Sequence, residues 1–418
     1  MMVLLKFRKF FENVLGLFLI GCLFSCKTEI KNELPVLKTG FPGVEMPEIW
    51  IDADTGHEIR KVTNRQGDNR SFYFHNYPFY FDKIKGDTLM VFYGDTADGR
   101  QLFSVNLTNG DTRKITGSPG EIRGEILGKK THKIYFHKGN KLFSSSVDTG
   151  EEKLVYTFPD STYASVAALN ATENLLAGVM ALKADHKVLD TMKGGRNFDN
   201  IYEAKILRHI FTLDPESGTL RIVYTENAWL NHLQFSPSDP NLLMYCHEGP
   251  WHKVDRIWTL DLNSGKSKLM HKRSVYREIA GHEFFSPDGE HIWFDLQIPR
   301  GETFYLAGRQ LTDSTETRYE LKRNEWSIHY AMAPDRQSFA GDGGDSTQVA
   351  HAKDGMWLYH FVPDGNSFRS EKLVNMKYHN YDLEPNVHFT PDGKAIIFRA
   401  NFEGKSQIYE VKLRKTID

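Results

Sequence analysis

Residues 232–265 read HLQFSPSDPNLLMYCHEGPWHKVDRIWTLDLNSG, and residues 281–289 read GHEFFSPDG. The first stretch predicts a strand, a turn at residues 236–239, a second strand, a loop and a third strand, because Pro and Gly are confined to the connections. The second stretch starts the same pattern again, with a His followed by Ser-Pro-Asp-Gly. The loop at residues 246–252 is rich in side chains that can act in catalysis or bind a ligand. These two stretches predict a repeated all-β unit in which one loop, residues 246–252, carries candidate active-site side chains.

The same unit recurs along the chain with a period of roughly 40–50 residues, which is typical of β-propeller blades. The copies share a pattern that closes with a D-x-x-(S/T)-G turn and a short outer strand. They lie at about 72–116, 121–157, 162–225, 230–270, 280–321, 326–374 and 384–413. The last copy lacks its outer strand, and residues 49–59 supply strands that belong to no copy. We therefore predict a seven-bladed β-propeller of four-stranded antiparallel blades over residues 48–418, with the ring closed by the N-terminal strands.

The N-terminus has the features of an export signal. Basic residues precede an apolar run that is too short to span a bilayer comfortably, and small residues and cysteine follow. Residues 1–26 are predicted as a lipoprotein signal peptide cleaved before Cys26, with Cys22 as the alternative, and residues 27–47 as a flexible tether. Cys246 is then the only other cysteine, so no internal disulfide is expected. The prediction is an exported lipoprotein, periplasmic or anchored in the outer membrane of a Gram-negative bacterium.

Composition excludes some classes of function. The formal net charge is −2, so nothing in the overall charge indicates a nucleic-acid partner, and an anionic substrate would need a local basic cluster. The chain has no G-x-S-x-G motif, which argues against a serine hydrolase.

The repeat predicts which side chains converge. Five residues before the turn proline of successive units stand His232, His282, His329 and Asn386. Equivalent positions ring the channel of a propeller on one face, and the loop carrying His247 opens on that face. Imidazoles with a nearby carboxylate suit a divalent metal, and Glu384 supplies the carboxylate. A separate neutral imidazole is suited to accept a proton.

The third unit carries an insertion at residues 182–204. It is either a surface loop or a wall of the cleft, and long loops in compact domains are more often functional. Its basic residues would hold carboxylates of an acidic substrate, and they are Lys183, His186, Lys187, Lys193 and Arg196.

From about residue 48 to the C-terminus the chain resembles the oligogalacturonate lyase family. The resemblance rests on residues 246–250 (CHEGP), 228–230 (AWL), 282–284 (HEF) and 389–392 (FTPD). It implies a seven-bladed propeller that cleaves oligouronides by β-elimination. It also implies that His247 is the base and that His282 binds a manganese-like ion.

The last blade departs from the family pattern. A Gln-x-x-His-x-His group of metal ligands is matched by Tyr381, Glu384 and Asn386. Oxygen donors still suit manganese, and also magnesium or calcium. A supporting arginine has two candidates, Arg208 and Arg256. We assign Arg208 to catalysis beside His247, and the following residues to substrate binding: His232, His329, Arg256 and Lys187.

The predicted function is therefore metal-assisted cleavage of acidic oligosaccharides to 4,5-unsaturated products. The alternative is a non-catalytic propeller lipoprotein that binds glycan or protein at the cell surface. That alternative does not require His247 and His282 to lie close together in the fold.

Overall fold

The structure is a computed structural model that describes residues 33–83 and 85–417. The chain divides into two units between Pro35 and Val36, and the second is described here. The predicted signal peptide, with Cys22 and Cys26, lies outside the described residues. No helix of the described part is long and apolar enough to cross a membrane.

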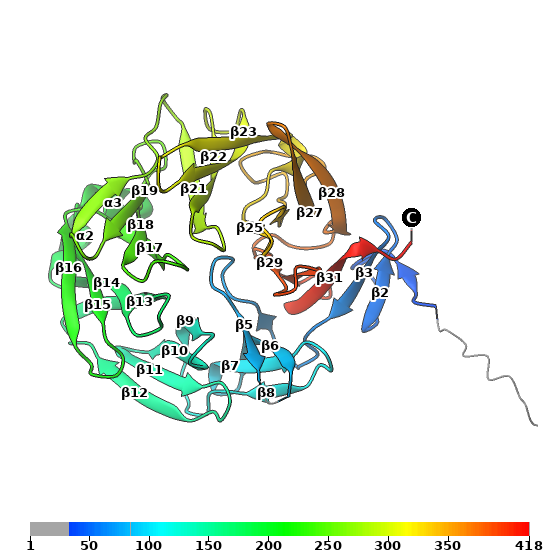
Figure 1. Cartoon of the computed structure of the whole chain (residues 1–418), viewed down its shortest axis with the longest axis horizontal. Coiled ribbons are helices and arrows are strands. Elements are labelled where there is room, and N and C mark those ends of the chain that lie inside the picture. The colour runs from blue at the N-terminus through cyan, green and yellow to red at the C-terminus, as the bar shows by residue number, and fades with distance from the viewer. Residues whose placement is uncertain (1–32, 84, 418) are drawn as a thin grey trace, which may run out of the picture. The chain divides into compact units, whose positions relative to one another are not determined.

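The unit is built of antiparallel sheets placed around a centre (Figure 1), which confirms the predicted all-β fold. Three sheets have four strands each, in simple sequence order. Their strands are β9 (Arg123–Gly128), β10 (Lys133–Lys138), β11 (Lys141–Ser146) and β12 (Glu152–Thr157); β13 (Thr162–Leu169), β14 (Leu176–Leu182), β15 (Arg208–Leu213) and β16 (Leu220–Glu226); and β17 (Leu230–Phe235), β18 (Leu242–His247), β19 (Ile257–Asp261) and β20 (Lys266–Leu269).

A larger sheet contains two four-stranded antiparallel groups. A single parallel pair, Glu320 with Ser367, joins their outer strands. The groups are β21 (Ile279–Phe285), β22 (His291–Gln297), β23 (Phe304–Gln310) and β24 (Glu316–Leu321), and β25 (Tyr330–Met332), β26 (Phe339–Gly341), β27 (Trp357–Asp364) and β28 (Ser367–Asn375). A further sheet contains β4 (Asn69–Arg70), β5 (Phe79–Asp82), β6 (Asp87–Thr96), β7 (Gly99–Asn106) and β8 (Thr112–Lys114).

The remaining sheet joins the two ends of the unit. Strand β3 pairs antiparallel with β31, so N-terminal and C-terminal strands share one sheet. Its order is β1 (Val36–Leu37), β2 (Ile49–Asp52), β3 (His57–Lys61), β31 (Gln407–Lys415), β30 (Ala395–Ala400) and β29 (His388–Phe389).

The predicted tether, residues 27–47, is corrected for its second half. Strand β1 pairs in parallel with β2, and Thr39 and Met46 are buried. The hydroxyl of Thr39 donates to Asp52 Oδ2 over 2.7 Å and accepts from the Trp50 indole over 3.1 Å. These contacts were not visible in sequence, because the charges and prolines of this segment are typical of a linker.

The core lies between the faces of neighbouring sheets. One cluster contains Val91 and Leu102 of β6 and β7 together with Ile134 and Phe136 of β10. Inner strands such as β10 are buried on both faces, whereas the outer strand β8 is exposed throughout. Burial of apolar side chains on both faces of the inner strands stabilises the arrangement of the sheets.

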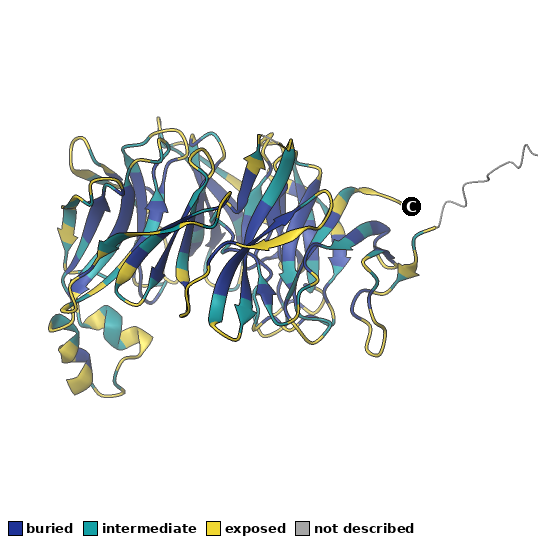
Figure 2. Cartoon of the chain, turned by 90° about the horizontal axis from the view of Figure 1, so that it is seen from below, coloured by how far each residue is buried: buried dark blue, intermediate teal, exposed yellow. Residues whose placement is uncertain are grey.

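The insertion folds into short helical segments that project at one end of the strands (Figure 2). These are η1 (Asp185–Lys187), α2 (Val188–Thr191) and α3 (Phe198–Glu203); a separate short helix, η2 (Arg323–Glu325), follows β24. Leu189 of α2 is buried in a small apolar cluster with Ala181 and Ile206. The insertion is therefore an ordered element.

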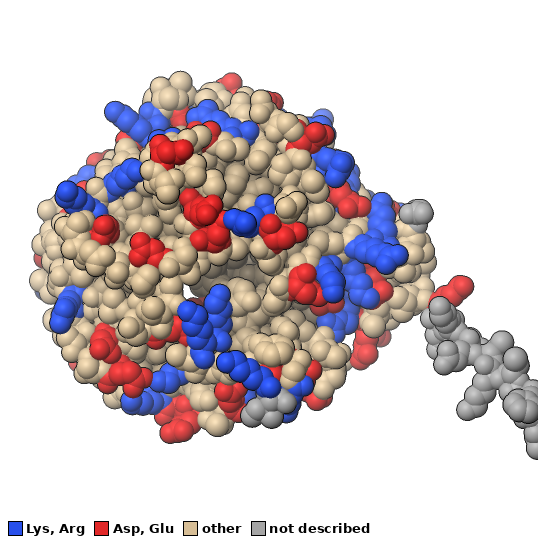
Figure 3. Space-filling view, in the orientation of Figure 1, with Lys and Arg blue, Asp and Glu red and all other residues tan. Residues whose placement is uncertain are grey.

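Charges of both signs alternate over the face shown in Figure 3, including around the hollow at its centre. This agrees with the formal net charge of −2. An anionic ligand would therefore have to be bound by a local cluster of basic side chains.

Candidate active site

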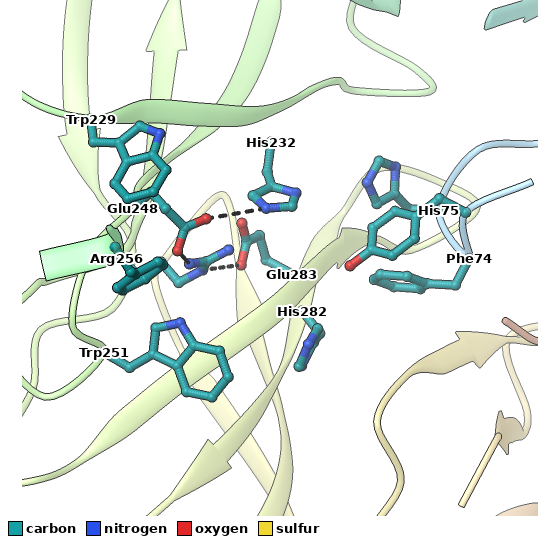
Figure 4. A pocket seen from close by; sticks show the side chains of 11 residues that line it. Phe74, His75, Trp229, His232, Glu248, Trp251, Arg256, His282 and Glu283 are labelled. Carbon is teal, nitrogen blue, oxygen red and sulfur yellow. Dashed lines mark hydrogen bonds and ion pairs between the residues drawn. The ribbon is translucent and has the colours of Figure 1, made fainter. Parts of the chain in front are cut away.

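A cavity of about 270 Å³ lies where the loop after β18 meets β17, β21 and the segment before β5 (Figure 4). Its wall combines aromatic rings with buried ionisable groups. The lining residues are Tyr73, Phe74, His75, Phe198, Trp229, His232, Glu248, Trp251, Arg256, His282 and Glu283. Aromatic faces beside a few fixed charges are typical of small-ligand sites.

Three of the four residues that the repeat places at one position share an unusual backbone. His232, His282 and Asn386 have φ values of 47°, 49° and 52°. In β17 and β21 the strand register shifts at the histidine, as at a β-bulge. A left-handed conformation is uncommon for residues other than glycine and clusters at functional sites.

Arg256 is the fixed cation of the cavity. Its Nη1 donates to Glu248 Oε1 over 2.7 Å, and its Nε donates to Glu283 Oε2 over 3.0 Å. The other Glu248 oxygen lies 3.2 Å from His232 Nε2. Burial alone would raise the pKa of Glu248, but His232 and Arg256 hold it at about 2. The guanidinium is therefore locked in place before any ligand arrives.

A possible metal-donor group within this network fits a cation poorly. Potential ligand atoms of His232, Cys246 and Glu248 lie within 4.8 Å of one another. However, burial raises the pKa of the Cys246 thiol well above its usual range, and Glu248 is already paired with Arg256. Metal ligation requires a thiolate and a free carboxylate.

His282 has the arrangement of a general base. Its Nδ1 lies 2.9 Å from Oδ1 of the buried Asp295, whose Oδ2 accepts from Gln297 over 3.2 Å. Burial lowers the pKa of His282, but Asp295 outweighs burial and the net shift is upward. A carboxylate on one ring nitrogen fixes the tautomer and leaves the other nitrogen to accept a proton.

His329 and Glu384 fit a divalent cation. The Nδ1 of His329 lies 2.9 Å from Asp342 Oδ2, and its Nε2 is buried without a hydrogen-bond partner among the described residues. Glu384 Oε2 lies 3.8 Å from that Nε2, which is too far for a hydrogen bond. The His329 and His282 rings are 5.0 Å apart. A metal-binding imidazole commonly donates its other ring N–H to a carboxylate, which fixes the orientation of the ring.

Two predicted metal ligands, Tyr381 and Asn386, contact the backbone in this structure. The Tyr381 hydroxyl is buried and donates to the carbonyl oxygen of Asp342 over 3.0 Å. The Asn386 side chain accepts from the Phe74 amide over 2.8 Å and donates to the Glu384 carbonyl over 3.1 Å. Both side chains therefore hold the backbone around the site. Residue type and spacing suggested ligands, but they could not show where these side chains point.

The two predicted catalytic residues do not line the cavity. His247 lies on the opposite side of β18 from Cys246 and Glu248, with its Nε2 3.0 Å from Glu226 Oε2 and its ring 5.0 Å from that of Trp258. Arg208 donates to the Ala228 carbonyl over 3.1 Å. Their catalytic roles stay predictions.

Two of the four predicted substrate-binding residues line the cavity. His232 and Arg256 line the cavity, and His329 is buried behind it. Lys187 is exposed in η1 and does not line the cavity. The insertion instead contributes Phe198, whose ring lies 5.1 Å from that of Trp229, so it does form part of the wall.

The sequence analysis did not pair Asp295 and Asp342 with the two histidines, although a signal was present. Each aspartate follows its histidine by 13 residues in successive repeats, His282 with Asp295 and His329 with Asp342. Tyr73 and Glu283 carried no such periodic signal.

The fold and the cavity together define an all-β protein with an acid–base site beside a fixed cation. The profile of the oligogalacturonate lyase family matches residues 47–417, and the chain belongs to that family. The resemblance inferred from sequence is thereby confirmed.

Two curated relatives match nearly the whole chain. The oligogalacturonide lyase of Pectobacterium atrosepticum is 25% identical over 390 residues, covering 88% of this chain and 96% of the relative. The oligogalacturonate lyase of Dickeya dadantii is 24% identical over 393 residues, with the same coverage.

Two solved structures share the fold. The oligogalacturonate lyase of Vibrio parahaemolyticus superposes with a TM-score of 0.77 at 22% identity, covering 89% of this chain and 97% of the other. An oligogalacturonate lyase in complex with manganese gives a TM-score of 0.75 at 21% identity, with coverage of 88% and 96%.

Proposed function

We propose that this protein cleaves oligogalacturonates by β-elimination in the cavity of Figure 4, with His282 as the base. The observation that carries the proposal is the Asp295–His282 pair, 2.9 Å apart, in a cavity that also contains Arg256. Family membership supports the substrate class and the reaction.

The residues account for each proton and electron pair of the elimination. The Nε2 atom of His282 removes the C5 proton, the C5–H electrons form the C4–C5 double bond, and the C4–O bond breaks. Arg256 stabilises negative charge that develops on the uronate as the proton leaves. Burial raises the pKa of Tyr73, which lines the cavity, so its phenol stays protonated and can protonate the departing oxygen.

His329 and Glu384 would hold the divalent cation. We propose manganese, on the ground that one relative's structure is a manganese complex, with magnesium or calcium as alternatives. When bound, the cation supplies positive charge for the uronate carboxylate. In this proposal His282 is the base beside the cation rather than one of its ligands.

The sequence prediction gave the role of base to His247 instead. The cavity favours His282, because His282 lines the cavity whereas His247 pairs with Glu226 outside it. The two assignments make opposite predictions for single variants, so they can be separated directly.

The activity test uses the product's conjugated double bond. The protein, supplied with Mn²⁺, should generate new absorbance near the ultraviolet edge when it is mixed with oligogalacturonates. Binding alone creates no such chromophore, so affinity without absorbance would identify a non-catalytic glycan-binding protein instead.

We also infer that the unit is a closed seven-bladed propeller. The support is the run of strand groups β5–β8, β9–β12, β13–β16, β17–β20, β21–β24, β25–β28 and β29–β31, the last extended by β3. If β3 closes the ring, removing residues 33–61 should lower the melting temperature sharply. An unchanged melting temperature would contradict closure.

The N-terminal sequence supports a proposal about location. We propose that the chain is an exported lipoprotein of a Gram-negative bacterium, periplasmic or attached to the outer membrane through Cys26, with Cys22 as the alternative. Radiolabelled palmitate should mark the full chain and the Cys22→Ser variant but not Cys26→Ser. Labelling of the full chain and of Cys26→Ser, but not of Cys22→Ser, would identify Cys22 as the anchor, and no labelling of any form would contradict the anchor.

A further inference from the structure

A second cavity, of about 300 Å³, adjoins the first. Tyr73 lines both. The two are also linked through the buried His329, whose ring is 5.0 Å from that of His282 on one side and whose Nε2 is 3.8 Å from Glu384 on the other. The second cavity is lined by Arg70, Ser71, Tyr73, Tyr93, Arg100, Glu125, Asp382, Leu383, Glu384 and Arg399.

Two of its arginines have only loose partners. An Nη atom of Arg70 is 3.5 Å from Asp68, and the Nε of Arg100 is 3.9 Å from Asp95. The Nε of each is buried without a hydrogen-bond partner in the part of the chain that the structure describes. Buried donors are normally satisfied, so these two guanidinium groups favour an additional acceptor.

The third arginine, Arg399, is positioned by the backbone. Its Nε donates to the Glu384 carbonyl over 2.7 Å, and its Nη1 donates to the Ser71 carbonyl over 3.0 Å. These contacts hold the guanidinium at the cavity wall without neutralising its charge.

The carboxylates that line the cavity are engaged elsewhere. Glu125 accepts from the Tyr93 hydroxyl and from Asn76 Nδ2. Asp382 accepts from Asn380 Nδ2, and Glu384 faces His329. Among the described residues, none of these three carboxylates forms an ion pair or hydrogen bond with a lining arginine, so N–H donors of the guanidinium groups are available to a ligand.

We propose that this arginine cavity is a second uronate subsite, in which Arg70, Arg100 and Arg399 bind the carboxylate of the sugar next to the one that loses its C5 proton. The planar fork of a guanidinium matches a carboxylate in two parallel hydrogen bonds. The proposal rests on the proposed function. It explains why the protein would prefer a substrate that carries a carboxylate on every sugar.

The test is Arg100→Gln, because Arg100 is partly exposed and its side chain has no close hydrogen-bond partner to lose. Kinetics on trigalacturonate should show a KM raised about 10-fold or more with a smaller change in kcat, since a charge-assisted contact made in ground and transition states alike is lost. Arg221→Gln, an exposed arginine of β16 away from both cavities, is the matched control and should behave as wild type.

A second substrate makes the result specific. Methyl esterification of the uronate next to the reacting one should raise the KM of the wild type by a similar factor and leave Arg100→Gln nearly insensitive. Equal sensitivity of both proteins, or an unchanged KM in Arg100→Gln, would overturn the subsite. If the wild type produced no unsaturated product, the proposed function would fall, and calorimetric binding of trigalacturonate to the same proteins would still decide the subsite. Equal melting temperatures exclude misfolding as the cause.

Discussion

Oδ1 of Asp295 lies 2.9 Å from Nδ1 of His282, and the same contact recurs between Asp342 and His329 in the following repeat. The repeat thus supplies two oriented imidazoles side by side. One lines the open cavity and is suited to take a proton, and the other is buried next to a carboxylate and is suited to bind a cation. The same His–Asp pair therefore stands in two different surroundings, one at the cavity and one buried.

Replacing Asp295 by Asn should reduce kcat/KM by about 10²-fold or more, because the imidazole loses its orienting carboxylate. The base must be neutral to act, so activity falls below the pKa of His282, which Asp295 raises. The acidic limb of the pH profile should therefore move to lower pH in the variant. An unmoved limb would contradict the pairing, and Asp313→Asn, in an exposed turn of the same sheet, should change neither quantity.

Glu384→Gln should weaken Mn²⁺ binding, measured by calorimetry without substrate, by about 10-fold or more. The anionic oxygen near His329 Nε2 is lost, while the size of the side chain is kept. Glu290→Gln, on an exposed turn, serves as the control. Identical affinity in wild type and Glu384→Gln would remove Glu384 from the cation site.

The insertion can be tested through its one cavity-lining side chain. Phe198→Ala should raise the KM for oligogalacturonate several-fold with little change in melting temperature, because the exposed ring packs on Trp229 at the cavity wall. Val188→Ala, similarly exposed in the same insertion but away from the cavity, should leave KM unchanged. Equal effects of the two substitutions would mean that the insertion acts only through stability.

His271 offers a prediction about stability rather than catalysis. Its ring nitrogens lie 2.9 Å from Glu316 and 2.7 Å from the buried Glu278. Burial lowers the pKa of His271, but the two carboxylates outweigh burial and raise it. His271→Gln should lower the free energy of unfolding by about 3 kcal/mol, since the buried Glu278 loses its cation, whereas Glu316 keeps its pair with Arg318.

The pH dependence of that loss has a definite sign. A raised pKa stabilises the folded state fully below the unfolded value of about 6.5 and loses this contribution as pH rises through the higher folded pKa. The difference between wild type and His271→Gln in denaturant titrations should therefore shrink above neutral pH. A difference that grew with pH would contradict a charged His271.

The repeat made much of the fold predictable. The unit expected at 280–321 corresponds to β21–β24, residues 279–321, because strand alternation and turn residues are local signals. Side-chain direction was harder to predict. Tyr381 and Asn386 stand at ligand spacing, yet they bond to backbone atoms, and His247 falls on the far side of its strand. Such outcomes depend on bulges and packing between sheets, which one sequence does not display.

The central claim is that His282 is the base, and it is tested most directly by His282→Ala and His247→Ala measured together. For each variant, turnover would be followed by ultraviolet absorbance, and Mn²⁺ affinity and melting temperature would be recorded on the same preparation. We predict that His282→Ala loses about 10²–10⁴-fold in kcat with Mn²⁺ binding retained, whereas His247→Ala keeps turnover within a few-fold of wild type. Near-normal turnover in His282→Ala, with elimination abolished in a stably folded His247→Ala, would contradict the account and return the role of base to His247.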